Sequence, residues 1–102
     1  MRDDPGGVAM TGQETAETTA LQVLTWLVSD PEMIEPFLAA TGADPGQIAA
    51  LAREPHFLAA VVDFCLESDA RVIACAAALG LPPEAIGQAR MGLPGGRDPH
   101  WT

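Results

Sequence analysis

Residues 54–67 read EPHFLAAVVDFCLE, and this stretch decides the fold that the sequence predicts. Its apolar side chains recur at helical spacing over most of the circumference, which leaves a narrow polar strip with Asp63 and Glu67. Pro55 needs no amide hydrogen at the first helical position, and Glu54 places a carboxylate at the positive end of the helix dipole. We therefore expect a central helix from residue 55 to residue 67.

The same acidic-proline junction recurs elsewhere in the chain. Asp30-Pro31 and Asp44-Pro45 each precede a segment rich in Ala, Leu and Ile, and Pro82-Pro83-Glu84 repeats the theme. An Asp before a helix can accept hydrogen bonds from the unpaired N–H groups of the first turn. The expected helices cover residues 13–29, 31–41, 45–52 and 55–67, then a fifth from the Ser68 cap to Gly80 and a sixth from Pro83 to Gly92.

Pro36 falls inside the second expected helix. An interior proline removes one backbone hydrogen bond and its ring clashes with the preceding turn. We therefore expect either a kink, or a single turn followed by a restart at Pro36.

The composition predicts an all-α protein. The 102 residues include 18 alanines and no tyrosine, and 48% of the chain is hydrophobic. Alanine has the highest helix propensity and lets helices pack closely. We expect a compact orthogonal bundle of five or six short helices: a disordered N-terminal tail over residues 1–12, one helical domain over residues 13–93, and a flexible C-terminal tail over residues 94–102.

A weak repeat appears at an offset of 38 residues. Residues 39–42 (AATG), followed by Pro45 and Ile48, match residues 77–80 (AALG), followed by Pro83 and Ile86. Two explanations fit this register: a duplicated three-helix unit, or shared helix-stop and helix-start chemistry.

The charge balance excludes several partner classes. The net charge is −9, and the five cations are all arginines. Such a chain is repelled by phosphate backbones and anionic lipids, so we expect neither nucleic acid nor a membrane as partner. No apolar run reaches the roughly 20 residues of a transmembrane helix, and the N-terminus has no secretory signal. We expect a cytoplasmic protein with reduced cysteines.

Residues with reactive or metal-binding chemistry are few. Cys65 and Cys75 are ten residues apart, which is neither a CxxC motif nor a zinc-knuckle spacing, and both fall on apolar faces. We expect buried free thiols; a disulfide between the helices is the alternative. His56 lies at the start of an expected helix and His100 in the expected C-terminal tail, so the sequence gives no reason to place them together. Asp63 and Glu67 share one face of a helix, which we expect to be acidic and solvated.

No nucleophile elbow, P-loop or dinucleotide-binding spacing is present, so we expect no catalytic residues, no cofactor and no metal. The main hypothesis is a non-catalytic protein-protein interaction or regulatory adaptor domain with a protein partner or as a homodimer. The alternative is a ligand-binding module or enzyme with an inter-helix apolar pocket lined by Phe37, Phe57, Phe64 and Cys65.

Two tryptophans are the candidate protein contacts. Trp26 lies about 140° around the first helix from the centre of the stripe formed by Ala20, Leu24, Leu27 and Val28. It either is buried within the monomer or contacts a partner, and tryptophan is enriched at binding hot spots. Trp101 lies in the C-terminal tail, either as a short docking motif or without function.

Two runs of sequence carry a family resemblance. The first is Trp26-Leu27, Asp30-Pro31-Glu32, Phe37-Leu38 and Thr41-Gly42; the second is residues 57–64 (FLAAVVDF) with residues 80–86 (GLPPEAI). They resemble a small family found mainly in proteobacteria and catalogued only as a domain of unknown function, DUF3572. The resemblance covers roughly residues 20 to 94. It implies a helical, cytosolic protein without assigned activity, and its motifs are packing and capping residues.

Overall fold

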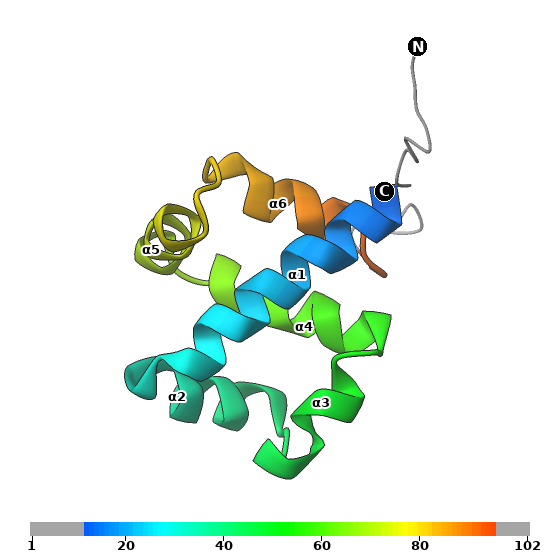
Figure 1. Cartoon of the computed structure of the whole chain (residues 1–102), viewed down its shortest axis with the longest axis vertical. Coiled ribbons are helices and arrows are strands. Elements are labelled where there is room, and N and C mark those ends of the chain that lie inside the picture. Colours follow the sequence, from blue (N-terminus) through cyan, green and yellow to red (C-terminus); the bar gives the residue numbers. More distant parts are fainter. Residues whose placement is uncertain (1–11, 96–102) are drawn as a thin grey trace.

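The computed structural model describes residues 12–95, and this part of the chain is an all-α bundle without strands. The predicted fold class is therefore confirmed (Figure 1). The elements are α1 (Gly12–Ser29), α2 (Pro31–Thr41), the 3-10 turn η1 (Pro45–Gln47), α3 (Ile48–Leu51), α4 (Pro55–Leu66), α5 (Asp69–Leu79) and α6 (Glu84–Met91).

The acidic-proline junctions begin helices as predicted, although they do so in different ways. Asp30 accepts a hydrogen bond from the N–H of Glu32 at 2.9 Å, and Asp44 accepts one from Gly46 at the same distance. Glu54 precedes α4 without a side-chain cap bond. The shorter Asp side chain is the better N-cap, so the carboxylate of Glu54 contributes at most its charge.

The expected third helix is a 3-10 turn followed by a single short α-helical turn. Where one helix over residues 45–52 was predicted, the chain forms the three-residue 3-10 turn η1 and then the four-residue α3. A segment this short forms too few backbone hydrogen bonds to offset the free-energy cost of helix nucleation. Ile48 and Ala52 are its half-buried contacts with the core.

Pro36 does not split α2. The helix runs continuously from Pro31 to Thr41, so the predicted restart at Pro36 is wrong. Pro36 removes only one hydrogen bond, and the carbonyl of Glu32 that loses its partner lies on an exposed turn where water can replace it. The next residue, Phe37, is completely buried and holds the helix against the bundle.

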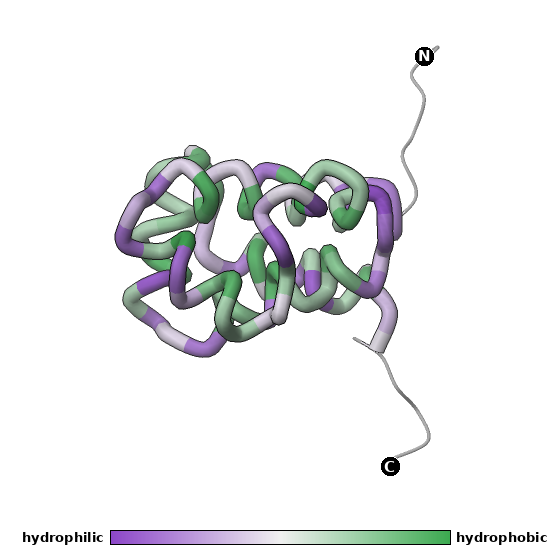
Figure 2. Tube along the Cα trace, turned by 90° about the horizontal axis from the view of Figure 1, so that it is seen from below, coloured by the Kyte–Doolittle hydropathy of each residue, from purple (hydrophilic) through white to green (hydrophobic). Residues whose placement is uncertain are grey.

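The core lies where α1 crosses α4 (Figure 1), and the other long helices pack around this pair. Figure 2 shows hydrophobic and hydrophilic residues alternating along the trace, as expected of amphipathic helices. The ring of Phe37 meets Phe57 and Phe64 edge-on, with centroid distances of 6.0 and 5.5 Å. These contacts join α2 to α4.

Two residues predicted to lie in apolar stripes are exposed. Val28 of α1 is 38% exposed and Leu66 of α4 is 36% exposed. Each lies in the last turn of its helix, at the edge of the stripe.

The repeat at 38 residues is present in the structure. Helices α2 and α5 start and end 38 positions apart, and Gly42 and Gly80 close them in the left-handed conformation. The buried positions of α1 and α4 also correspond: Ala20, Val23, Leu24 and Leu27 match Leu58, Val61, Val62 and Cys65. Helices α1 and α4 each pack against both α2 and α5. The first two helices of each half therefore correspond in their spacing and buried positions, which fits both explanations of the repeat.

The halves differ at their third helix. Helix α6 packs closely along α1 and against α4, whereas α3 makes little contact with the other helices. Gly92, just after α6, approaches Gly12 and Ala16 so closely that a Cβ placed there would lie 2.7 Å from the Ala16 Cβ. Leu93 is buried, and the Arg90 Nη1 donates to the Pro94 carbonyl at 2.8 Å.

The predicted tails lie almost wholly outside the described residues, although Gly12 already belongs to α1. No single helix within residues 12–95 has both the length and the apolar composition needed to cross a membrane. Helices α5 and α6 meet these criteria only when taken together, across a bend of 99°.

Candidate functional site

Trp26, the first candidate protein contact, lies on α1 and is half-buried against the hydrophobic core. Part of its ring system is therefore used for packing within the monomer, and part remains accessible. Trp101, the second candidate, lies outside the described residues.

An uncharged surface runs along the solvent side of α1. Residues 18–29 contain no charged side chain. We call this surface the α1 outer face, and its exposed residues are Thr18, Leu21, Gln22, Thr25, Val28 and Ser29. The hydroxyl groups of Thr18 and Thr25 donate to carbonyls one turn earlier in the same helix, each at 3.0 Å. Neither hydroxyl therefore needs a partner outside the helix, which favours contact with an apolar surface.

A second uncharged surface lies on α5 and is more apolar. The exposed residues of this α5 outer face are Ala70, Ile73, Ala74, Ala77 and Ala78. Ile73 is 61% exposed, the highest exposure among the large hydrophobic side chains of residues 12–95. The face carries no hydrogen-bonding or titratable side chain. It can therefore act only through apolar contact.

Three charged residues lie near the α5 outer face: Asp69 is exposed in the first turn of α5, four residues before Ile73, while Arg71 and Glu67 pair with each other. Arg71 turns toward α4, where its Nη1 donates to the Phe64 carbonyl at 2.8 Å and its guanidinium lies 4.0 Å from the centroid of the Phe64 ring. Glu67 lies 3.6 Å from the same Nη1. These interactions fix the start of α5 on α4.

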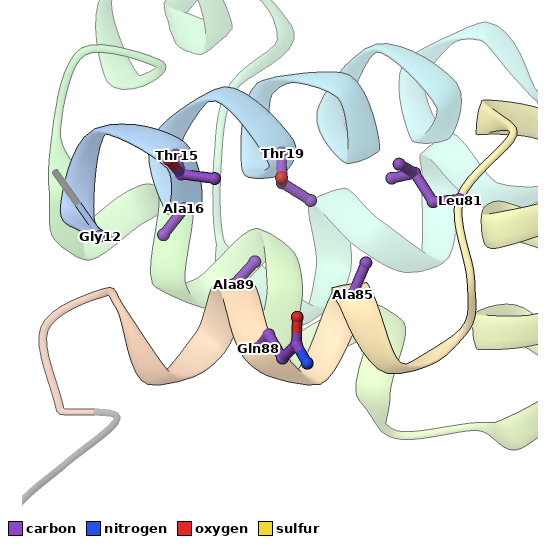
Figure 3. Close-up of a pocket in the computed structure, with 8 residues that line it drawn as sticks. All are labelled: Gly12, Thr15, Ala16, Thr19, Leu81, Ala85, Gln88 and Ala89. Carbon is purple, nitrogen blue, oxygen red and sulfur yellow. The ribbon is translucent and has the colours of Figure 1, made fainter. Parts of the chain in front are cut away.

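A groove of about 430 Å³ lies between α1 and α6. Figure 3 shows Ala16 pointing from α1 toward α6, while Ala85 and Ala89 point back toward α1. Thr15, Thr19 and Gln88 supply the polar atoms of its lining. Because none of the eight lining residues is titratable, the groove offers hydrogen bonds and van der Waals contact but no general acid or base.

The pocket expected among Phe37, Phe57, Phe64 and Cys65 is replaced by packed core. Phe37, Phe64 and Cys65 are buried, and the rings contact one another edge-on. Close packing of this kind fills the space that a ligand would need. The groove between α1 and α6 lies elsewhere, and its lining shares no residue with the expected pocket.

The two cysteines are free and fully buried, so the prediction of buried thiols is confirmed and the alternative disulfide is wrong. A hydrogen bond between the two side chains lowers the pKa of Cys65, while burial opposes this shift. The same hydrogen bond and burial raise the pKa of Cys75. The pair lies between α4 and α5 in the interior, away from any substrate in solution.

The acidic side chains of α4 form ion pairs. Asp63 accepts a hydrogen bond from the Arg90 Nε at 2.6 Å, and this contact ties α4 to α6. Glu67 is paired with Arg71, as described above. His56 is exposed, and the described residues contain no cluster of three metal-ligating side chains. The predicted acidic face is therefore partly neutralised by arginines.

Residues 13–96 match the family described as protein of unknown function (DUF3572). This match covers more than half of the chain. The chain belongs to this family. Searches of curated proteins and of solved structures found no match.

Within this DUF3572 domain, the surface that sequence reasoning missed is the α5 outer face. The periodicity places Val72, Cys75 and Leu79 inward, which leaves Ile73 and four alanines on the opposite side. The signal that could have found it is the absence of charge from Val72 to Pro83, in a chain whose net charge is −9. Alanines are first interpreted as strong helix formers, so the exposed apolar face that they form is easily overlooked.

Proposed function

We propose that this DUF3572 domain is a cytoplasmic interaction or adaptor domain that binds another protein without catalysing a reaction. The observation that carries the proposal is the distribution of exposed apolar side chains. Leu21, Val28 and Ile73 all lie in uncharged stretches of an otherwise acidic chain. Uncharged helix faces that carry exposed apolar side chains are suited to contact with another protein.

The chemistry of the groove between α1 and α6 supports the same conclusion. The groove between α1 and α6 is lined by alanines, threonines, one leucine, one glycine and one glutamine, which provide no titratable group. The buried thiol pair is sealed in the core, and the acidic residues of α4 are engaged by arginines. The half-buried Trp26 adds an aromatic side chain beside the α1 outer face, where it can contribute to binding.

The test is affinity purification of the tagged full chain at its native expression level, followed by mass spectrometry. We expect at least one protein to co-purify. An untagged copy of the chain itself counts as such a protein. The double variant Leu21→Glu/Ile73→Glu should lose that protein, because a charge buried without a partner opposes association. Native mass spectrometry that instead found a bound small molecule, with no protein retained, would replace the adaptor function by ligand binding.

A further inference from the structure

We propose that the groove between α1 and α6 is the docking site for residues 96–102 of the same molecule, with the indole of Trp101 as the inserted group. The proposal goes beyond the interaction function above, since it concerns neither of the two outer faces. Residues 96–102 read GRDPHWT and lie outside the described residues. Trp101 is the one large apolar side chain of this segment.

The chain leaves the described part of the fold beside this groove. Leu93 is buried and the Arg90 Nη1 donates to the Pro94 carbonyl at 2.8 Å, so the backbone is held against the bundle here. A second hollow, of about 390 Å³, lies between the start of α1 and residues 91–95, and it shares Gly12 with the groove. A chain that continues from Gly95 therefore starts at an open end of the groove.

The segment is long enough to reach into the groove. Six residues lead from Gly95 to Trp101, and six extended residues span at most about 20 Å. Helix α6 has eight residues, which makes it about 12 Å long. Trp101 can therefore reach the part of the groove that is lined by Ala85 and Ala89.

The shape of the groove suits an aromatic ring. Ala16 points from α1 and Ala85 and Ala89 point back from α6 (Figure 3), and these small side chains leave about 430 Å³ open. An aromatic side chain buries roughly 150–250 Å² when it is covered. Trp101 is therefore the strongest apolar anchor among the residues outside the described range.

Polar groups in the groove remain available to the indole. On α1, the hydroxyls of Thr18, Thr25 and Ser29 each donate to a carbonyl one turn earlier. Within residues 12–95, the side chains of Thr19 and Gln88, which line the groove, make no such hydrogen bond. The indole N–H is a donor and needs one acceptor when it is buried, which the Thr19 Oγ1 or the Gln88 Oε1 can supply.

Tethering selects the same molecule as the source of the segment. A short linker gives an effective concentration in the millimolar range, so even millimolar affinity keeps about half of the molecules docked. Two separate chains of net charge −9 repel each other, which disfavours insertion between copies. Arg97 and Asp98 offset each other within the segment, and residues 1–11 contain no aromatic side chain that could compete.

Fluorescence of the full-length Trp26→Phe variant, in which Trp101 is the only tryptophan, tests the proposal. Its emission maximum should lie at a shorter wavelength than that of the peptide GRDPHWT, because the docked indole is shielded from water. Acrylamide should quench it at least ~2-fold less than it quenches the peptide, as expected when half or more of the molecules are docked. Both values should be independent of protein concentration.

A matched pair of substitutions in this background locates the docking site. Ala85→Leu fills the groove from α6 and should return the emission and the quenching to the values of the peptide. Ala74→Leu makes the same change on the exposed α5 outer face and should leave both values unaltered.

Circular dichroism reports whether these variants are folded. Should Trp26→Phe or Ala85→Leu unfold, Trp101→Ala provides the second test, because it changes no residue of the described fold. Compared with the wild-type chain, its amide NMR resonances should move for residues 15–19 and 85–89 and stay in place for α2.

The proposal would be overturned by emission and quenching equal to those of the peptide, or by a blue shift that Ala85→Leu leaves intact. A blue shift that appears only as the protein concentration rises would place the tryptophan in a second copy and overturn docking within one molecule. Groove resonances that move when residues 1–11 are removed, but not in Trp101→Ala, would assign the groove to the N-terminal residues instead.

Discussion

At the scale of single residues, the acidic side chains before the helices are not equivalent. Asp30 accepts a hydrogen bond from the N–H of Glu32, while Glu54 makes no side-chain cap bond. We predict that Asp30→Ala lowers the free energy of unfolding by about 1 kcal/mol, because a first-turn N–H group loses its partner. Urea denaturation followed by circular dichroism measures this change.

Glu54→Ala is the matched control for the cap, since it removes a carboxylate from the same helix position without removing a cap bond. It should change the stability much less than Asp30→Ala. Equal losses from both substitutions would mean that charge near the helix dipole, and not the hydrogen bond, is what the acidic residues supply.

At the scale of elements, the contact between α1 and α6 depends on a missing side chain. A Cβ on Gly92 would lie 2.7 Å from the Ala16 Cβ and 2.9 Å from the Gly12 carbonyl oxygen. Gly92→Ala should therefore push α6 away from α1 and lower the free energy of unfolding by about 1–3 kcal/mol, the range found for overpacked sites. Thermal and urea unfolding both report this loss.

The control for this contact lies one and a half turns earlier on α6. A Cβ on Gly87 would have no heavy atom within 4 Å, and the residue is inside the helix. Gly87→Ala should stabilise the protein by about 0.5–1 kcal/mol through helix propensity alone. If Gly92→Ala also stabilised the protein, the close approach of α1 and α6 would not be a feature of the folded state in solution.

At the scale of the whole molecule, stability is unevenly distributed. Helices α1 and α4 hold the core, whereas η1 and α3 contain no fully buried residue. Residues 45–52 pack against the core through the half-buried Ile48 and Ala52. We predict that amide hydrogens of residues 45–52 exchange much faster than those of α1 and α4 in hydrogen-exchange mass spectrometry, because the segment can open without disrupting the core. Protection of this segment equal to that of α4 would contradict the prediction.

The sequence predicts helix positions well because the relevant forces are local. Proline before a helix, glycine after it and apolar spacing placed α2, α4 and α5 within one or two residues. The predictions were wrong where tertiary contacts determine the local structure. Pro36 is accommodated within α2 because Phe37 packs into the core, and α3 is short because few residues cover it. The α5 outer face was missed because exposure depends on which neighbours are absent, and periodicity alone does not reveal that.

The close contact of Gly92 with Gly12 also decides how this domain can be combined with others. The beginning of α1 and the end of α6 meet at one end of the bundle, so the chain enters and leaves the fold at nearly the same place. A domain with adjacent ends can be inserted into a surface loop of a host protein without stretching either partner. This geometry makes the fold suitable as a module that is carried within a longer polypeptide.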